Sequence, residues 1–266
     1  MAQDGNQLRL TFNPIIIDAY VNGQDFARFE EHDIEHLKDL YQKNDVSKSD
    51  KKLIKKAIQK SETAENGILQ YDYKKDTPYG KYSAASSLLG LSKILKNDVY
   101  VKYESLYIVN VKYSIINAIA ELYNRNLPRI NDLFTNYVTH LNNYKTIWGS
   151  EKQAKHNFSR LVDSPEHKNT DDPFIQSLVN ELQIVQKSFQ TPSNLNHKQI
   201  IGIYTTFIMD CVYQYLVQNE FIRDRHCSLG NNGIFFKPLK PFDKQTEIPK
   251  IENYVFERTN LNIHFS

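Results

Sequence analysis

The segment from His197 to Asn219 constrains the fold more than any other part of the chain. It is apolar on most sides, which is typical of a helix buried at the centre of a domain. Neither this segment nor any other has the run of about 18 apolar residues that a membrane-spanning helix needs. The first residues lack the basic start and apolar stretch of a secretory signal. We therefore expect an intracellular protein that is not secreted and has no membrane partner.

The chain changes character after this segment. Short apolar stretches at His226–Leu229 and Gly233–Lys237 flank Asn231-Asn232-Gly233, and Asn-Gly is typical of a two-residue β-hairpin. Leu106–Val109 and Asn262–Phe265 predict further short strands. The remaining periodic segments predict helices, at Phe26–Gln42, Ser49–Lys60, Ala84–Lys96, Ser114–Asn124, Arg129–Tyr144, Glu151–Val162, Phe174–Phe189 and Ile248–Arg258. We expect an α+β fold, mainly helical, with an N-terminal helical segment (1–65) and a main domain (66–266).

Charge and cysteine content exclude several classes of protein. The chain has 33 basic and 31 acidic side chains, so any affinity for nucleic acid must come from a local basic patch. Cys211 and Cys227 form no Cys-x-x-Cys pair, which argues against a disulfide framework or a zinc ribbon. There is also no Gly-x-Ser-x-Gly elbow and no glycine-rich phosphate loop. We therefore predict no catalytic residues, no cofactor and no metal.

One short motif nevertheless matches a known metal-binding pattern. His32-Asp33-Ile34-Glu35-His36 matches the H-x-x-E-H pattern of inverted zinc peptidases, in which two histidines on one helical face hold Zn²⁺. The stretch is acidic throughout and offers no convincing third ligand. We favour a solvated helix face over a zinc site.

Two segments combine features of nucleic-acid binding. Lysines from Lys51 to Lys60 could form a positive stripe on a helix, although a solvated helix face is the simpler interpretation. Tyrosines and lysines alternate between Tyr71 and Tyr82, which is the composition of surfaces that stack bases and neutralise phosphates. A plain strand and turn explains the second segment equally well.

From Tyr71 onward the order of motifs resembles the family A-like DNA polymerases of virophages and transpovirons. Tyr79-Gly80-Lys81-Tyr82-Ser83-Ala84 is similar to their Gly-Arg-aromatic-Ala entry, and the segment from Ser87-Leu88 to Lys96 is similar to their following basic helix. Val109-Asn110 with Ser114-Ile115-Ile116, the pair Lys152 and Lys155, and Asn232-Gly233-Ile234 resemble later motifs. The resemblance implies a palm-like antiparallel sheet, and phosphate or base contacts at Tyr79, Lys81, Lys93, Lys96, Lys152 and Lys155.

The metal-binding positions depart from that family. Where it has Asp-x-Asp, this chain has Ser105 and Tyr107, and where it has the hairpin aspartate, this chain has Asn232. Polymerases hold two Mg²⁺ ions with carboxylates, so these side chains predict that the chemistry is lost.

Three hypotheses follow. The first is a degenerate polymerase-like domain that binds single-stranded or primed DNA, or a replication protein, in the cytoplasm or a viral replication compartment. The second is a protein-interaction or virion-associated scaffold with no nucleic-acid role, using the Phe26–Tyr41 face or the C-terminal hairpin. The third is an active nucleotidyltransferase that holds metal through Glu104 or Asp98.

Overall fold

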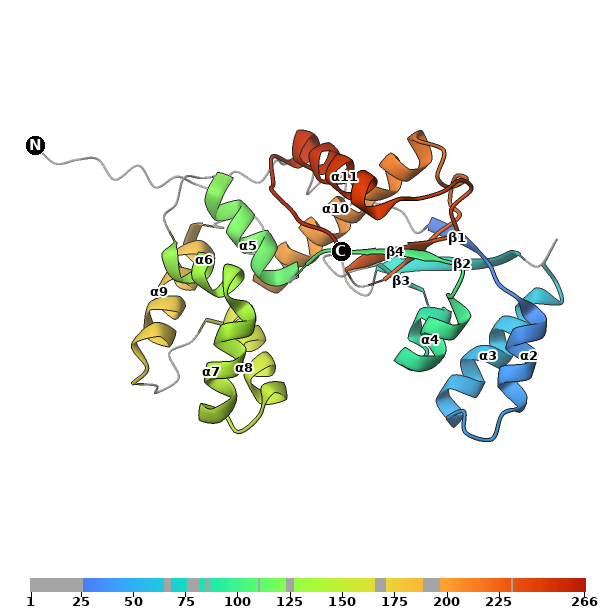
Figure 1. Cartoon of the computed structure of the whole chain (residues 1–266), viewed down its shortest axis with the longest axis horizontal. Coiled ribbons are helices and arrows are strands. Elements are labelled where there is room, and N and C mark those ends of the chain that lie inside the picture. Colours follow the sequence, from blue (N-terminus) through green and yellow to red (C-terminus); the bar gives the residue numbers. More distant parts are fainter. Residues whose placement is uncertain are drawn as a thin grey trace, which may run out of the picture. The chain divides into compact units, whose positions relative to one another are not determined.

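The computed structural model describes residues 26–64, 68–75, 82–84, 87–109, 111–122, 127–165, 171–188, 197–230 and 232–266. They divide into two compact units. The helical unit takes the described residues of Ile108–Phe207 together with Val255–His264. The sheet unit takes the described residues of Gly23–Tyr107 together with Ile208–Tyr254 and Phe265–Ser266 (Figure 1). No described helix combines the length and apolarity required to cross a membrane.

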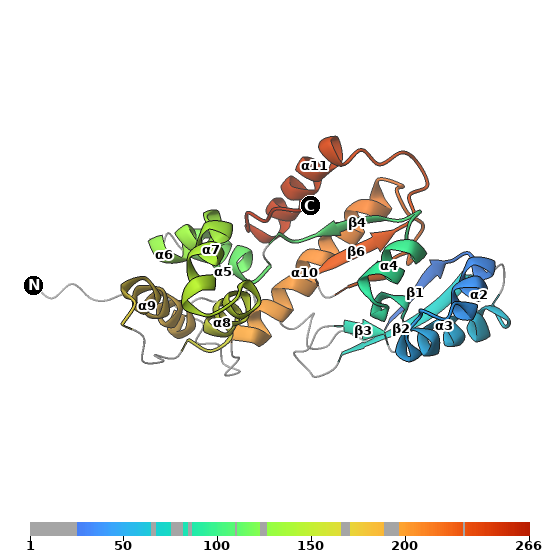
Figure 2. The same ribbon diagram turned by 60° about the horizontal axis from the view of Figure 1, so that its bottom comes forward.

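The helical unit is built from packed helices (Figure 2). They are α5 (Val111–Leu122), α6 (Pro128–Thr135), α7 (Tyr137–Ile147), α8 (Glu151–Asp163), α9 (Pro173–Ser188) and the first half of α10 (His197–Gln218). Polar links join them: Lys112 Nζ donates to Asp163 Oδ1 of α8 at 2.6 Å. The Glu181 carboxylate of α9 accepts the free backbone N–H groups of Arg129 and Ile130 at the start of α6.

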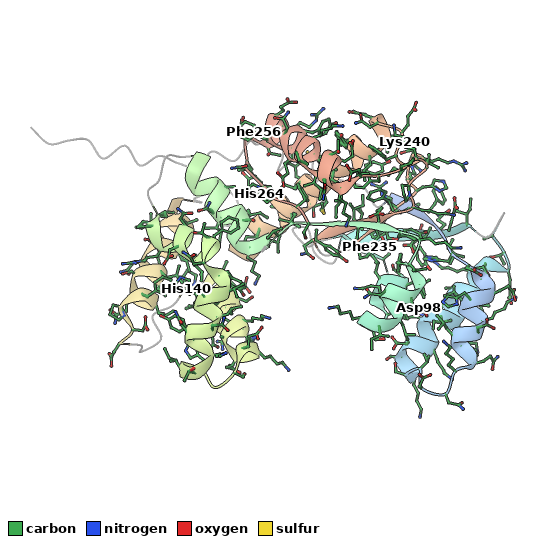
Figure 3. All side chains as sticks on the ribbon, viewed as in Figure 1. Asp98, His140, Phe235, Lys240, Phe256 and His264 are labelled. Atoms are coloured by element: carbon green, nitrogen blue, oxygen red, sulfur yellow. The ribbon has the colours of Figure 1, made fainter. Side chains whose placement is uncertain are left out.

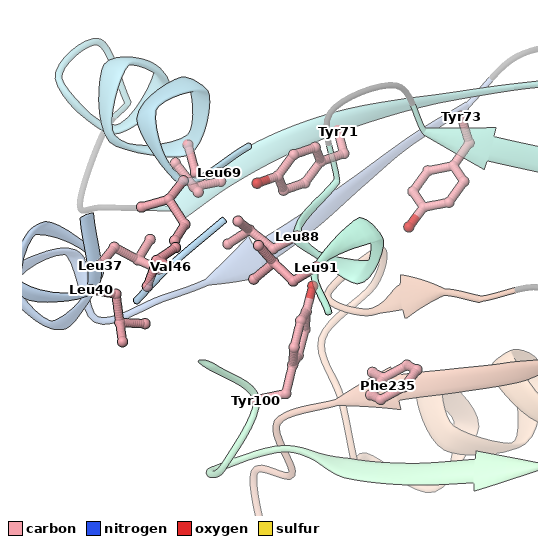
Figure 4. Close-up of a cluster of buried hydrophobic side chains, with 12 residues drawn as sticks. Leu37, Leu40, Val46, Leu69, Tyr71, Tyr73, Leu88, Leu91, Tyr100 and Phe235 are labelled. Atoms are coloured by element: carbon pink, nitrogen blue, oxygen red, sulfur yellow. The ribbon is translucent and has the colours of Figure 1, made fainter. Parts of the chain in front are cut away.

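Sheet A of the sheet unit is antiparallel, with β1 (Phe26–Glu31), β2 (Ile68–Lys75) and β3 (Tyr82–Ala84) in that order. Alternate residues of β2 are buried, so one face of the sheet points into a core. The helices α2 (Ile34–Gln42) and α3 (Lys48–Ser61) add their apolar stripes to this core. Figure 4 shows Leu69, Tyr71 and Tyr73 of β2 projecting into the cluster, with Tyr100 rising from the opposite side.

Sheet B contains β4 (Glu104–Tyr107), β6 (Gly233–Phe236) and β5 (Ser228–Leu229), in that spatial order. All pairs are antiparallel, and β5 and β6 form a hairpin. The last residue covers the other edge of β4, because Tyr107 N donates to Ser266 O and Ser266 N donates to Tyr107 O, each at 3.0 Å. The helix α4 (Lys93–Val99) belongs to the same unit, and α11 (Lys244–Thr259) begins in it.

The fold class is α+β, as the sequence predicts, and most predicted helices and the hairpin are confirmed within a few residues. The largest error concerns the predicted helix at Phe26–Gln42. Its first part is strand β1, whose residues pair with β2 from Phe26↔Tyr73 to Glu31↔Ile68. The helix begins only at Ile34, where the Asp33 side chain accepts the His36 N–H at 3.1 Å as an N-cap. The N-terminal segment is therefore not purely helical.

Other differences are smaller. The predicted helix Arg129–Tyr144 is divided at Asn136 into α6 and α7. The predicted helix Ala84–Lys96 becomes a short 3₁₀ turn at Leu88–Gly90 followed by α4. The predicted strand Asn262–Phe265 reduces to a single bridge at Phe265. The division at residue 65 does not coincide with the two units, because β1 and β2 lie on either side of it in one sheet.

The core around sheet B supplies the first prediction. Phe235 of β6 is 7% exposed and packs against Tyr100 and Tyr107, with ring centroids 5.3 and 5.4 Å away. Replacing it by alanine (Phe235→Ala) removes a buried ring and leaves a cavity. We expect the free energy of unfolding, measured with urea, to fall by about 3–5 kcal/mol.

Phe256→Ala is the matched control. Phe256 is 48% exposed, so its loss is expected to change the unfolding free energy by about 0.5 kcal/mol or less. Equal effects of the two substitutions would contradict the packing described for Phe235.

Candidate functional site

The three positions that the resemblance assigns to polymerase metal-binding motifs lie in β4 and directly before β6. Tyr107 is the cross-strand partner of Gly233, and Asn232 directly precedes Gly233. Ser105 lies two residues back along β4, opposite Phe235, and therefore on the same face as Tyr107. Segments more than a hundred residues apart in the sequence thus bring Asn232 next to the strand that carries Ser105 and Tyr107 on one face.

Contact between Tyr107 and Gly233 fixes this arrangement. A Cβ atom added to Gly233 would lie 2.5 Å from Tyr107 Cδ1 and 2.7 Å from the backbone oxygen of Leu106. No side chain fits at that spacing, and a backbone oxygen cannot move aside cheaply. Glycine at the start of β6 is therefore a requirement of the close approach between β4 and β6.

Nothing at these three positions supplies a negative charge. The carboxylate on β4 belongs to Glu104, and it lies 3.9 Å from the ammonium group of Lys244. The same ammonium donates to the backbone oxygen of Ser105 at 2.8 Å. Asp98 on α4, labelled in Figure 3, lies 3.2 Å from His36 Nε2. Across the described residues, no group of three or more His, Cys, Asp or Glu side chains is placed to hold a metal ion.

Aromatic rings fill much of the face that carries Ser105 and Tyr107. Phe235, labelled in Figure 3, lies on this face, and its ring contacts the rings of Tyr100 and Tyr107. Lys96 of α4 places its ammonium group 5.9 Å from the centroid of the Phe235 ring. The face is therefore packed with side chains and is far from the open, acidic surface that a two-metal site needs.

The predicted phosphate-binding lysines differ in their availability. Lys93 is exposed at the start of α4, whereas Lys96 is partly buried against Phe235. Lys152 and Lys155 are exposed on α8 in the helical unit, but Lys155 forms an ion pair with Glu151 one turn earlier. The hydrogen bond to Glu151 is the main cause that raises the pKa of Lys155. Tyr79 and Lys81 lie outside the described residues.

The tyrosines of β2 do not form a base-stacking surface. Tyr71 and Tyr73 are 0% and 1% exposed, because their positions on β2 face the core of the sheet unit. The strand interpretation is therefore correct for residues 71–75, residues 76–81 lie outside the described residues, and stacking by these two rings is excluded. On α3, Lys52, Lys55 and Lys56 are exposed as expected for a solvated helix face.

A buried polar network occupies the interior behind β1. Glu30 is fully buried, and its Oε2 accepts the hydroxyl of Tyr100 at 2.8 Å and lies 2.7 Å from His32 Nε2. Burial is the largest and the Glu30 carboxylate the second largest of the causes that raise the pKa of Tyr100 well above its ordinary value. The hydroxyl therefore remains protonated and can donate. The two histidines of the H-x-x-E-H motif do not share a helical face, since His32 precedes α2 and contacts Glu30 whereas His36 contacts Asp98. Its interpretation as a zinc site is not supported.

Sequence reasoning missed Lys244 and the Glu30 network for different reasons. Lys244 contacts Ser105 of β4, which is 139 residues away in the sequence, and no local sequence pattern predicts such a contact. The network had a signal, because Arg28, Glu30 and His32 alternate with Ala27, Phe29 and Glu31 in the manner of a strand with one polar buried face. The helical interpretation of Phe26–Gln42 obscured it.

The two cysteines offer no nucleophile. Both Cys211 and Cys227 are buried thiols. Burial raises the pKa of the Cys227 thiol to about 12, so it is protonated at neutral pH.

Comparison with known proteins adds no assignment: no protein-family model, curated protein or solved structure matches this chain.

The Glu30 network supplies the second prediction. Tyr100→Phe keeps the buried ring and removes only the hydroxyl that donates to Glu30. Because a buried acceptor then loses a donor, we expect the unfolding free energy in urea to fall by about 1–3 kcal/mol. Tyr254→Phe, which removes an exposed hydroxyl bonded to Gln218, is the control and should change it by about 0.5 kcal/mol or less. If both variants matched the parent protein, the bond would have no stabilising role.

Proposed function

We propose that the protein is a catalytically degenerate polymerase-like domain that binds nucleic acid, as single-stranded or primed DNA, or binds a replication protein. The observation that carries the proposal is the pairing of β4 with the β5–β6 hairpin, which puts Ser105 and Tyr107 on one face of sheet B and Asn232 next to Gly233, the partner of Tyr107. In chain order the helices α5 to α10 are inserted between β4 and this hairpin. A palm sheet interrupted by a helical fingers region would have this order of elements.

Loss of chemistry is part of the proposal. Phosphoryl transfer by a polymerase needs carboxylates that bring two Mg²⁺ ions to the triphosphate and the primer. Ser105, Tyr107 and Asn232 carry no charge, and Lys244 already lies beside Glu104. An ammonium group at this position opposes a second cation by electrostatic repulsion. The proposal therefore keeps the palm-like framework and omits the reaction, since a fold can persist without its original function.

Exposed lysines supply the proposed contact with phosphates. Lys93 on α4 and Lys152 on α8 are exposed and extend from helices, where their positions are fixed by the packed apolar faces. With a net charge of +2, the chain as a whole provides little attraction, so binding must depend on such local cations.

The third prediction tests this proposal by fluorescence anisotropy with labelled primed DNA over a salt series. We expect the affinity for DNA to fall steeply as the salt concentration increases. In the double variant Lys93→Gln/Lys152→Gln, the slope of log affinity against log salt concentration should be shallower by about one to two released counterions. Lys250→Gln is the control, because Lys250 pairs with Glu247 on α11. Failure of the parent protein to bind at any salt concentration would rule out a nucleic-acid role.

The fourth prediction concerns catalysis. In a parallel assay with nucleotides and Mg²⁺ or Mn²⁺, we expect no primer extension. Extension that disappears in Glu104→Gln would instead establish an active nucleotidyltransferase in which Glu104 holds metal, and the degenerate assignment would be wrong.

A scaffold function is the second candidate, and exposed apolar side chains around α4 favour it. Ile94 and Val101 are 83% and 74% exposed, which is unusual for large aliphatic residues and typical of contact surfaces. A pull-down that recovers one stoichiometric protein, and loses it in Ile94→Asp/Val101→Asp, would favour this candidate if the DNA titration is negative.

A further inference from the structure

The outer face of sheet A is separate from the palm-like sheet and contains a groove. Side chains alternate along β1 and β2, so Arg28, Glu30 and Tyr71 face the core while Phe29, Gln70 and Asp72 face outward. The groove has a volume of about 570 Å³, which is within the usual range of small-ligand sites. Its lining comes from β1, β2, the end of α3 and the segment before β5, as Phe29, Lys60, Thr63, Ala64, Ile68, Gln70, Asp72 and His226.

Two aromatic rings form one wall of this groove. Phe29 and His226 have ring centroids 5.5 Å apart and planes inclined by 39°, and both side chains are only partly buried. Burial is the main cause of a lowered pKa of His226. The lowered pKa favours the neutral imidazole at neutral pH. A flat, uncharged heterocycle can stack on such a pair of partly exposed rings, one of which is a neutral imidazole.

Beside this aromatic pair, β2 presents hydrogen-bond acceptors to the groove, since Gln70 is the cross-strand partner of Phe29. Gln70 Nε2 donates to Asp72 Oδ1 at 3.1 Å, which directs the amide nitrogen toward the carboxylate. The amide oxygen of Gln70 and the second carboxylate oxygen of Asp72 remain as acceptors. Such a pair matches a ligand edge that donates hydrogen bonds, and an exocyclic amino group of cytosine, adenine or guanine is such a donor.

Lysines are placed to contact a phosphate near this groove. Lys60 donates to the backbone oxygen of Gln70 at 3.0 Å, and its ammonium group has two further N–H donors. Lys74 is exposed two residues beyond Asp72 on the same face of β2. Both lie beside the strand that carries the acceptor pair.

We propose that this groove binds a nucleobase with an exocyclic amino group, in single-stranded nucleic acid, by stacking on Phe29 and by hydrogen bonding to Gln70 and Asp72. The inference rests on the proposed function and deepens it, because it assigns base contacts to a surface distinct from the lysines of α4 and α8. Thymine and uracil lack the exocyclic amino group and are the disfavoured bases.

The experiment compares labelled oligo(dC) and oligo(dT) of equal length by anisotropy at pH 8. We expect the parent protein to bind oligo(dC) roughly 5- to 100-fold more tightly than oligo(dT). Asp72→Asn should remove most of this preference. Phe29→Leu keeps an apolar side chain but loses the aromatic face, and should weaken binding to both oligonucleotides by roughly 5- to 100-fold. Phe256→Leu is the control for an exposed aromatic residue on α11.

A second measurement separates failure of this inference from failure of the proposed function. Titration of the ¹⁵N-labelled protein with dCMP should shift the amide signals of Phe29, Gln70 and His226, with dTMP producing smaller shifts. DNA binding that is unchanged in Phe29→Leu and Asp72→Asn would overturn the inference and leave the proposed function standing. Absence of DNA binding together with absence of dCMP shifts would overturn both, whereas dCMP shifts without DNA binding would support the groove alone.

Discussion

Close contact between the Tyr107 ring and Gly233 is the constraint on which the sheet unit depends. It permits β4 and β6 to pair only in the register that places Tyr107 opposite Gly233 and Ser105 opposite Phe235. A shift by one residue would turn Leu106 outward and bring a side chain into the space that only glycine can occupy. The backbone bonds between Tyr107 and Ser266 then cover the remaining edge of β4, so that the strand has partners on both sides.

This register also determines which side chains share one face of sheet B. Ser105, Tyr107 and Phe235 share a face because they are paired or alternate along the strands, and Tyr100 packs on the same ring cluster. An aromatic face stabilises the unit through apolar burial, whereas carboxylates at these positions would be costly to bury without a metal ion. The aromatic packing and the uncharged side chains of Ser105 and Tyr107 are therefore physically consistent with each other.

How far the sequence predicted this structure depends on the range of the interactions involved. The helix at Ser49–Lys60 and the long helix after His197 follow from periodicity, and both are present. The predicted hairpin is present as β5 and β6, but Gly233 lies in β6 opposite Tyr107 and is not the turn residue that the Asn-Gly signal implies. The strand at Phe26–Glu31 was misinterpreted, because its buried face carries Arg28 and Glu30, which single-sequence reasoning assigns to solvent. The contact of Lys244 with Ser105 depends on a tertiary approach that no local pattern encodes.

The strand β1 connects the interior of the sheet unit with its outer face. Glu30 faces inward, where Tyr100 and His32 surround its carboxylate, and the adjacent Phe29 faces outward into the groove beside His226. Phe29 N also donates to Arg225 O at 2.8 Å, which holds the segment before β5 against β1. The position of the aromatic pair is therefore set by backbone pairing and by a buried polar network, and it does not rely on flexible side chains alone. A surface held in this way is pre-organised, so a ligand that stacks there loses little of its binding free energy to ordering the protein.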